Sequence, residues 1–249
     1  MIKVSDVMSP VVVSVGPDSS MREILDALSR ERSGRVLVLR DGKPEAIITT
    51  RGIVQAYSKY GRDLMELGAK DLRSERLMSV SVDESVQNVL REMASHDIGG
   101  VPVMDGNVIV GMFTERDLVR LMAKMQYSGL VDSIMSTNLV TIDENADSLE
   151  ASKLMTERKV RRLPIMREGK IVGIVTAADI VKGLTQGAEP KPVLQIGTKN
   201  PLVVRRLDTI MKAVKIMDEK RIGTLPVVED RLVGIITERD LIYASINSI

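Results

Sequence analysis

The sequence predicts an α/β fold, α+β in detail, assembled from four copies of one small unit. Two patterns carry this prediction: a hydrophobic-Pro-hydrophobic triplet, and a Gly-hydrophobic-hydrophobic-Thr-x-x-Asp motif that follows it. The triplets begin at Val101, Leu163 and Leu225, the motifs begin at Gly111, Gly173 and Gly234, and both recur every 61 or 62 residues. A degenerate copy, Ala46 to Gly52, precedes them. Self-similarity at a fixed interval indicates a repeated structural unit.

Each repeat is predicted to run strand, helix, strand, strand, helix. A short apolar strand such as 139–142 opens it, and an amphipathic helix with apolar residues at helical spacing follows. The apolar faces are Met21, Ile24, Leu25 and Leu28; Val86, Val89, Leu90 and Met93; Ala151, Leu154 and Met155, where the pattern is looser; and Ile210, Ala213, Val214 and Met217. Two β-rich runs then flank a tight turn at Asp41-Gly42, Asp105-Gly106, Glu168-Gly169 or Glu229-Asp230. The second helix begins at Thr-x-x-Asp.

The repeats are assigned to residues 1–62, 68–125, 129–186 and 193–249, with linkers at 60–70, 125–129 and 187–192. The opening Asp6-Val-Met-Ser9 of repeat 1 resembles Ser133-Ile-Met-Ser136 of repeat 3, and repeats 2 and 4 lack it. This second symmetry indicates a duplicated pair. A unit of ~60 residues is marginally stable alone. We therefore expect repeats 1 and 2, and repeats 3 and 4, each to form one module by packing sheets face to face.

Composition excludes several classes of function. Lys and Arg total 35 and Asp and Glu total 34, so no global field attracts nucleic acid or an anionic membrane. Cys is absent and His96 is the only His, which removes thiolate and His-cluster metal sites and a Ser–His triad. Aromatic residues make up 2%, too few for base stacking. No apolar run approaches the ~18 residues of a membrane span, and the start lacks a signal peptide, so a cytoplasmic protein is expected.

The recurrent Thr-x-x-Asp has two explanations. It is a variant of the capping box, in which the Thr and the Asp satisfy amides at a helix start. It also lies at a strand-to-helix turn, where free amides and the helix dipole favour an anion. There the Thr suits a phosphate and the Asp suits the paired hydroxyls of a ribose. From the residues alone, the two explanations are equally good.

With these repeats, triplets and motifs, the whole chain resembles the CBS-domain (cystathionine β-synthase domain) family. The resemblance implies two tandem Bateman modules, each a pair of repeats with two clefts that commonly bind AMP, ADP or ATP, or S-adenosylmethionine-type ligands. It also implies that the Asp binds ribose, the Thr binds phosphate and the residue before the Asp faces phosphate. The residues carried over are Thr114, Arg116 and Asp117; Thr176 and Asp179, with Ala178 between them; and Thr237, Arg239 and Asp240.

Repeat 1 departs from the pattern, because Ala46 and Gly52 replace Gly and Asp and no Pro follows Arg35-Val36. Its own ribose site is expected to be lost, although Arg35 could reach a neighbouring ligand. Arg161 and Arg162 belong to a basic segment that is either a solvated face or a phosphate site. We take the phosphate alternative and expect repeats 3 and 4 to form the main nucleotide site.

The sequence therefore predicts a non-catalytic regulatory protein that senses energy state or a metabolite by binding an adenine nucleotide, with or without Mg²⁺. The alternatives are a scaffold, a nucleic-acid-associated regulator, or a binder of an S-adenosylmethionine-type ligand. An enzyme is not expected, because no second catalytic group recurs beside the carboxylates. No metal site, membrane partner or nucleic-acid partner is expected. We do expect an unidentified effector protein as a partner, and a homodimer formed through module packing.

Overall fold

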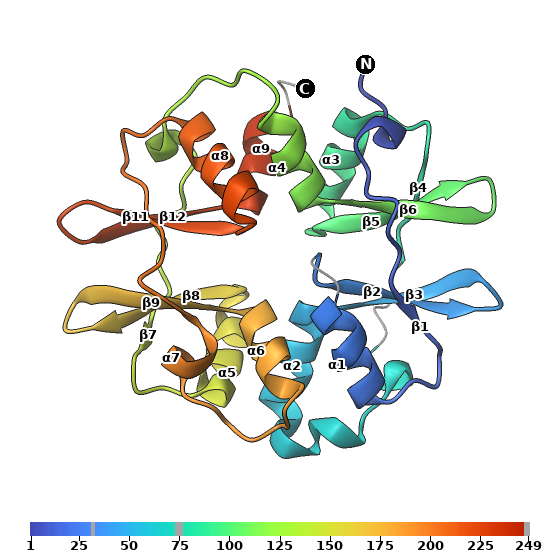
Figure 1. Ribbon diagram of the computed structural model, residues 1–249, viewed down its shortest axis with the longest axis horizontal. Coiled ribbons are helices and arrows are strands. Elements are labelled where there is room, and N and C mark those ends of the chain that lie inside the picture. The colour runs from blue at the N-terminus through green and yellow to red at the C-terminus, as the bar shows by residue number, and fades with distance from the viewer. Residues whose placement is uncertain (31–32, 73–76, 247–249) are drawn as a thin grey trace. The chain divides into compact units, whose positions relative to one another are not determined.

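The computed structural model describes residues 1–30, 33–72 and 77–246, and these form a mixed α+β structure. Within this part of the chain lie nine α-helices and four small sheets (Figure 1). The chain divides into two compact units. Unit 1 contains 1–12, 78–139 and 202–249, and unit 2 contains 13–77 and 140–201. Each unit is therefore built from two repeats that are not adjacent in sequence.

Unit 2 contains the sheets and helices of repeats 1 and 3. From repeat 1 come β1 (Ser14–Val15), α1 (Met21–Arg30), β2 (Arg35–Arg40), β3 (Lys43–Thr49) and α2 (Thr50–Tyr60), and the segment after α2 forms η2 (Gly61–Glu66) and η3 (Ala69–Asp71). From repeat 3 come β7 (Ile142–Asp143), α5 (Ser148–Arg158), β8 (Arg162–Arg167), β9 (Lys170–Thr176) and α6 (Ala177–Leu184), followed by α7 (Val193–Ile196) and β10 (Thr198–Lys199).

Unit 1 contains the sheets and helices of repeats 2 and 4. From repeat 2 come β4 (Val80–Ser81), α3 (Val86–Ser95), β5 (Gly100–Asp105), β6 (Val108–Thr114) and α4 (Glu115–Met122). From repeat 4 come α8 (Ile210–Lys220), β11 (Thr224–Val228), β12 (Leu232–Thr237) and α9 (Glu238–Ser245). The short helices η1 (Val4–Asp6) and η4 (Val131–Ser133) precede the first strands of repeats 1 and 3 and also lie in this unit.

The predicted order of elements is confirmed in repeats 1 to 3. In each, the short first strand pairs in parallel with the second, and the second and third form an antiparallel hairpin. The hairpin turns fall where predicted, and Gly42, Gly106 and Gly169 adopt positive φ values of 76°, 57° and 77°. Repeat 4 differs, because its first strand is reduced to one parallel bridge between Val204 and Val227. The first strand of repeat 3 is also shorter than expected, spanning Ile142–Asp143.

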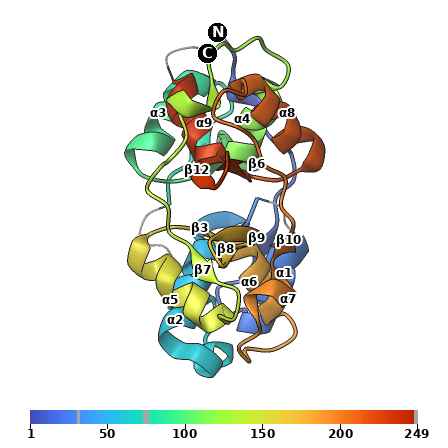
Figure 2. The ribbon, with the colours of Figure 1, turned by 90° about the vertical axis from the view of Figure 1, so that its left-hand side faces the viewer.

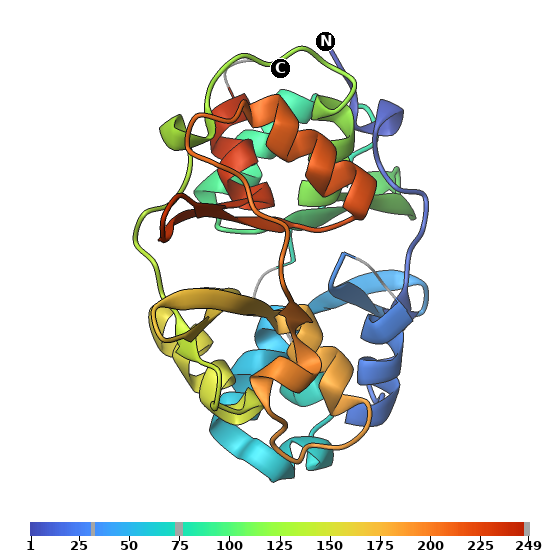
Figure 3. The ribbon, with the colours of Figure 1, turned by 60° about the vertical axis from the view of Figure 1, so that its left-hand side comes forward.

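The helices of the two repeats in a unit pack against each other. In unit 2, α2 lies against α5 and α6, and α1 lies against α6 (Figure 2). Tyr57 of α2 is fully buried there, and its hydroxyl donates to the carbonyl oxygen of Ala188 at 3.1 Å. In unit 1, α4 packs on α8 and α9 while α3 contacts α9 (Figure 3). The apolar helix faces predicted from sequence are buried in these cores, apart from the partly buried Leu154.

This helix packing joins repeat 1 with repeat 3 and repeat 2 with repeat 4. Face-to-face packing of the sheets of repeats 1 and 2, and of repeats 3 and 4, stays a prediction. The expected linker at 60–70 is instead structured as η2 and η3, which bury Leu64 and Ala69. These two apolar side chains join the unit 2 core, so the segment is part of the fold.

The opening segments of the repeats, which come before the first strand, are exchanged between sequence neighbours. Ser9, in the opening segment of repeat 1, exchanges two backbone hydrogen bonds of 2.9 and 2.8 Å with Met112 in β6 of repeat 2. Ser136, in the opening segment of repeat 3, does the same with Ile235 in β12 of repeat 4, at 2.9 Å each. Conversely, β10, in the opening segment of repeat 4, pairs with β9 of repeat 3. The chain passes between the two units four times as a result.

Candidate functional site

The three intact motifs place Thr and Asp in the same geometry at the start of a helix. In repeat 3, the Thr176 amide and hydroxyl both donate to Oδ2 of Asp179, at 2.8 and 2.7 Å. The same two bonds join Thr114 to Asp117 and Thr237 to Asp240, at 2.7 to 2.8 Å. Each motif is thus a capping box, as one of the two explanations required. Gly52 in repeat 1 keeps only the bond from its amide to Thr49 Oγ1.

Asp117 of repeat 2 is buried and forms hydrogen bonds within its own repeat. The residue is 2% exposed, and Arg120 one turn along α4 donates to its Oδ1 at 3.1 Å. Because Thr114 occupies Oδ2, both carboxylate oxygens already have partners. A ribose diol would therefore compete with the Arg120 guanidinium for this buried carboxylate.

Asp179 of repeat 3 keeps one oxygen available. The side chain is half-buried, and among the described residues its hydrogen bonds all involve Oδ2. Burial raises the pKa of Asp179 above its ordinary value of 3.8, although the Thr176 hydrogen bonds and Lys182 oppose the shift. A raised pKa marks a carboxylate whose charge lacks full compensation, and such groups cluster at functional sites.

Repeat 4 presents a different polar group beside its motif. Thr224 opens β11 and lies opposite Thr237 in the hairpin register. It is 8% exposed, and its Oγ1 has no hydrogen-bond partner among the described residues. Buried polar side chains nearly always have a partner, so an orphaned hydroxyl next to the motif is a candidate ligand contact.

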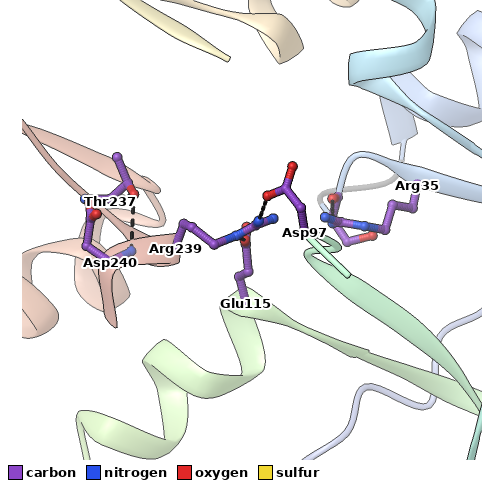
Figure 4. Close-up of polar contacts among 7 residues, drawn as sticks. Arg35, Asp97, Glu115, Thr237, Arg239 and Asp240 are labelled. Carbon is purple, nitrogen blue, oxygen red and sulfur yellow. Dashed lines mark hydrogen bonds and ion pairs between the residues drawn. The ribbon is translucent and has the colours of Figure 1, made fainter. Parts of the chain in front are cut away.

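The motif arginines of unit 1 are held in reciprocal contacts between repeats 2 and 4. Arg239 forms ion pairs with Glu115 and Asp97 of repeat 2 (Figure 4). Arg116 lies 3.4 Å from Glu238 of repeat 4 and donates to the carbonyl oxygen of Arg221 at 3.0 Å. Burial alone lowers the pKa of Arg239, but the Glu115 and Asp97 carboxylates outweigh it and raise that pKa. Phosphate contact by Arg116 and Arg239 therefore remains a prediction that competes with these pairs.

Sequence reasoning missed the acidic half of this arrangement. The identical tetrapeptide Thr-Glu-Arg-Asp at 114–117 and 237–240 was the available signal, since repeats 1 and 3 have no Glu at this place. The corresponding residues are Thr50 and Ala177. Unit 2 consequently lacks the reciprocal pair of unit 1.

The motif glycines have a structural cause. A Cβ at Gly111 would overlap the carbonyl oxygen of Ser9, and one at Gly234 would lie 2.6 Å from Met135 Sδ. At both glycines the close approach is made by the exchanged segments of the chain itself. Met8 and Met135, which the second sequence symmetry relates, lie at corresponding places over the two glycines.

The basic pair Arg161 and Arg162 lies at the start of β8, next to the repeat 3 motif. Arg162 is the register partner of Thr176, and the Arg161 carbonyl accepts from the amide of Ala177 at 2.9 Å. Both side chains are half-buried and take part in interactions within the protein. Thr176, Asp179 and Arg162 are thus brought together at one corner of the repeat 3 sheet, whereas Arg35 stands at the same corner of repeat 1.

Residues 1–30, 33–72 and 77–246 contain neither a candidate metal centre nor a candidate membrane span. No three acidic or imidazole side chains there form a group that could hold a metal ion. No helix in the same residues has the length and apolar character needed to cross a bilayer.

Comparison with known proteins places these repeats in a family. The model of the CBS domain matches four segments, 4–59, 69–124, 131–185 and 193–247, which together cover most of the sequence. The chain belongs to the CBS-domain family. The four matched segments correspond to the four CBS repeats predicted from the sequence, including the degenerate first copy.

Protein MJ1225 of Methanocaldococcus jannaschii is similar along its whole length. It is 25% identical over 263 residues, which cover 93% of this chain and 94% of that protein. Its crystal structure superposes with a TM-score of 0.87 at 22% identity over 97% of this chain and 99% of that chain. Both chains therefore share the four-repeat CBS fold.

Some other CBS relatives match less than half of the chain. The inosine-5'-monophosphate dehydrogenase of Korarchaeum cryptofilum is 35% identical over 42% of this chain but 21% of the enzyme, so only CBS repeats correspond. The CBS domain pair of protein MJ0100, solved with 5'-methylthioadenosine and S-adenosyl-L-methionine, is 34% identical. That likeness covers 46% of this chain and 94% of the pair, with a TM-score of 0.44.

Proposed function

We propose that this CBS protein is a non-catalytic regulator that binds an adenine nucleotide at its repeats, with repeat 3 as the principal site. One observation carries the proposal: the Asp179 carboxylate is half-buried, has a raised pKa and uses only Oδ2 for hydrogen bonds. A ribose diol could donate to Oδ1 without breaking the capping box. Such a bond to a charged acceptor stabilises a complex by about 1.5–3 kcal/mol.

The phosphate end of the ligand is assigned to the same corner of repeat 3. Arg162 stands opposite Thr176, and the first amides of α6 lie at the positive end of the helix dipole. A guanidinium can bind phosphate through two parallel hydrogen bonds. AMP, ADP and ATP all present this group, and Mg²⁺ would accompany the longer phosphate chains.

Regulation follows from binding only if the ligand distinguishes two arrangements of the protein. A ligand shifts such an equilibrium by its difference in affinity for the two states. Binding at one corner of a repeat could change how its sheet packs, which an effector protein or a second copy of the chain would detect. The repeats carry no recurring acid–base pair, in keeping with a regulatory rather than a catalytic role.

The test is calorimetric titration of the whole protein with AMP, ADP, ATP and S-adenosylmethionine, each with and without Mg²⁺. Asp179→Ala should reduce nucleotide affinity about tenfold or more, which corresponds to the loss of a charged hydrogen bond. Asp147→Ala is the matched control, because Asp147 caps α5 of the same repeat through the amides of Leu149 and Glu150. It should lower stability to a similar degree without changing affinity.

A scaffold is the second candidate, and the complete enclosure of Asp117 favours it for repeat 2. In a scaffold, all three motifs would serve only as helix caps. The scaffold function would be supported by two results together. The Asp179→Ala and Asp147→Ala proteins would lose stability equally, and none of the four compounds would give a heat of binding.

A further inference from the structure

We infer that the residue opening the second strand of each repeat sets the charge of the ligand that the repeat accepts. In the hairpin register this residue faces the motif Thr: the pairs are Arg35 and Thr49, Gly100 and Thr114, Arg162 and Thr176, and Thr224 and Thr237. Repeat 3 accepts an anionic adenosine compound through Arg162. Repeat 4 accepts an uncharged one through Thr224. The inference rests on the proposed function and assigns a ligand class to each site.

Repeat 4 offers a neutral polar contact. The buried Thr224 hydroxyl can donate one hydrogen bond and accept others, yet it makes none within the described structure. A ribose hydroxyl or the edge of a base complements such a group, whereas a phosphate would need a compensating cation. The nearby Arg239 cannot serve as that cation without giving up Glu115 and Asp97. The Glu115 side chain is 5% exposed, so moving Arg239 away would take an ion-pair partner from a buried carboxylate.

The charges around the motifs have opposite signs in the two units. Six positions correspond between the repeats. The first follows the first helix and is left-handed in repeats 2, 3 and 4, at Asp97, Lys159 and Arg221. The others are the residues two and three further on and the three residues after the motif Thr. In unit 1 these hold five carboxylates, Asp97, Glu115, Asp117, Glu238 and Asp240, and three basic side chains, Arg116, Arg221 and Arg239. In unit 2 the described positions hold one carboxylate, Asp179, and five basic side chains, Arg35, Arg51, Lys159, Arg161 and Arg162.

This difference decides where a phosphate chain is stabilised. A polyanion entering repeat 3 meets an excess of positive charge, and the positions of Glu238 and Arg239 are filled there by Ala177 and Ala178. In repeat 4 the same positions are balanced, with two carboxylates and two basic side chains, and Arg239 is already paired with Glu115 and Asp97 of repeat 2. A polyanion therefore meets no excess of positive charge there, whereas an uncharged nucleoside needs none and satisfies Thr224.

The experiment compares adenosine, which is uncharged, with ATP on the whole protein by calorimetric titration. Arg162→Thr should lower the affinity for ATP about tenfold, because one charged contact is lost. The affinity for adenosine should stay within twofold of that of the parent protein. Thr224→Arg, in an Asp179→Ala background, should strengthen ATP binding by a similar factor and weaken adenosine. The preference for ATP over adenosine should therefore follow the arginine from one repeat to the other.

Thr224→Val provides a test that does not require a buried arginine to be accommodated. Valine has nearly the shape of threonine, so removing the orphaned hydroxyl should raise the melting temperature of the ligand-free protein by about 2 °C or more. Adenosine should at the same time bind about fivefold more weakly. A purely structural Thr224 would lower the melting temperature when replaced and leave adenosine affinity alone.

Two results would overturn the inference, and they are distinguishable. If neither adenosine nor ATP binds the parent protein, the proposed function fails and the inference falls with it. The second result is that both compounds bind the parent protein but neither variant changes the selectivity. In that case the ratio of ATP affinity to adenosine affinity in Arg162→Thr stays within twofold of the parent ratio, and Thr224→Val binds adenosine as the parent does. Nucleotide binding then stands. In that case only the assignment of charge selection to this strand position is wrong.

Discussion

Glu115 of repeat 2 forms an ion pair with Arg239 of repeat 4, and Glu238 of repeat 4 pairs in turn with Arg116 of repeat 2. The two contacts come from the same Thr-Glu-Arg-Asp sequence at the start of α4 and α9. Each repeat therefore supplies both an acid and a base to its partner. The arrangement fastens the repeats of unit 1 to each other at the place where a nucleotide motif was expected to be open.

Removing Glu115 should destabilise unit 1. Glu115→Gln leaves Arg239 with Asp97 alone in a buried place, so we expect the free energy of unfolding to fall by about 2–3 kcal/mol. Urea denaturation monitored by circular dichroism measures this loss. Asp83→Asn is the control, since Asp83 pairs with Lys3 on the exposed surface and its replacement should produce no measurable change. Equal effects of the two substitutions would contradict a structural role for the reciprocal pair.

The hydroxyl of Tyr57 should stabilise unit 2. Tyr57→Phe removes the donor to the Ala188 carbonyl and leaves that buried acceptor without its partner, at a cost of about 1–2 kcal/mol. Tyr243→Phe serves as the control because Tyr243 is 55% exposed. The two proteins should separate in a urea titration, with only Tyr57→Phe shifting the midpoint. A midpoint unchanged by Tyr57→Phe would show that the contact adds nothing to stability.

Two glycines at different positions of the motif should respond in opposite ways to alanine. Gly111→Ala would push against Ser9 of the exchanged segment, so we expect a loss of about 1–3 kcal/mol and faster proteolysis near the N-terminus. Gly52→Ala meets only Thr49 Oγ1, at an ordinary 3.6 Å, and lies within α2. That substitution should gain up to about 1 kcal/mol from helix propensity. Thermal unfolding and limited trypsin digestion of both proteins check the contrast.

The pH dependence of stability should have opposite signs at Asp179 and Asp208. Burial raises the pKa of Asp179, so the folded state binds its proton more tightly than the unfolded chain. Its contribution to stability is therefore greatest at or below the ordinary value of 3.8 and declines as the pH rises through the folded pKa. Hydrogen bonds from the Arg205 amide and from Lys212 lower the pKa of Asp208, so its contribution is present above 3.8 and is lost on acidification through the folded pKa.

Asn substitutions reveal these slopes. Relative to the parent, Asp179→Asn should become progressively less destabilising, or more stabilising, as the pH rises above 3.8. Asp208→Asn should become progressively more destabilising as the pH rises toward 3.8 from below and should then stay nearly constant. Urea titrations at several pH values on both sides of 3.8 provide the measurement. Parallel slopes for the two variants would contradict the assigned shifts.

Much of the repeat structure could be predicted from the sequence, because local patterns determine it. The spacing of apolar residues identified the first helix of each repeat, and pairs such as Asp41-Gly42 located the hairpin turns. The Thr–Asp spacing identified the capping boxes. What local patterns lack is information on which apolar helix faces meet. The packing of α2 on α5 joins residues about a hundred positions apart, and nothing in either helix alone names its partner.

The candidate site was predictable only in part for a related reason. Thr176, Asp179 and Arg162 lie within one hairpin and helix start, so their proximity follows from repeat geometry. The partners of Arg116 and Arg239 come from another repeat and depend on long-range packing. Thr224 gave no signal in the sequence either, since a hydroxyl reveals the lack of a partner only when its surroundings are known.

The four passages of the chain between its two units mean that the halves of the gene are not the halves of the protein. A break near residue 127 would give two polypeptides, each holding half of both hydrophobic cores. Neither polypeptide could bury its helix faces alone, but the two together could restore both cores. The ancestral two-repeat chain implied by the internal duplication would have faced the same problem, and association with a second copy of itself would have solved it before fusion made the partnership covalent.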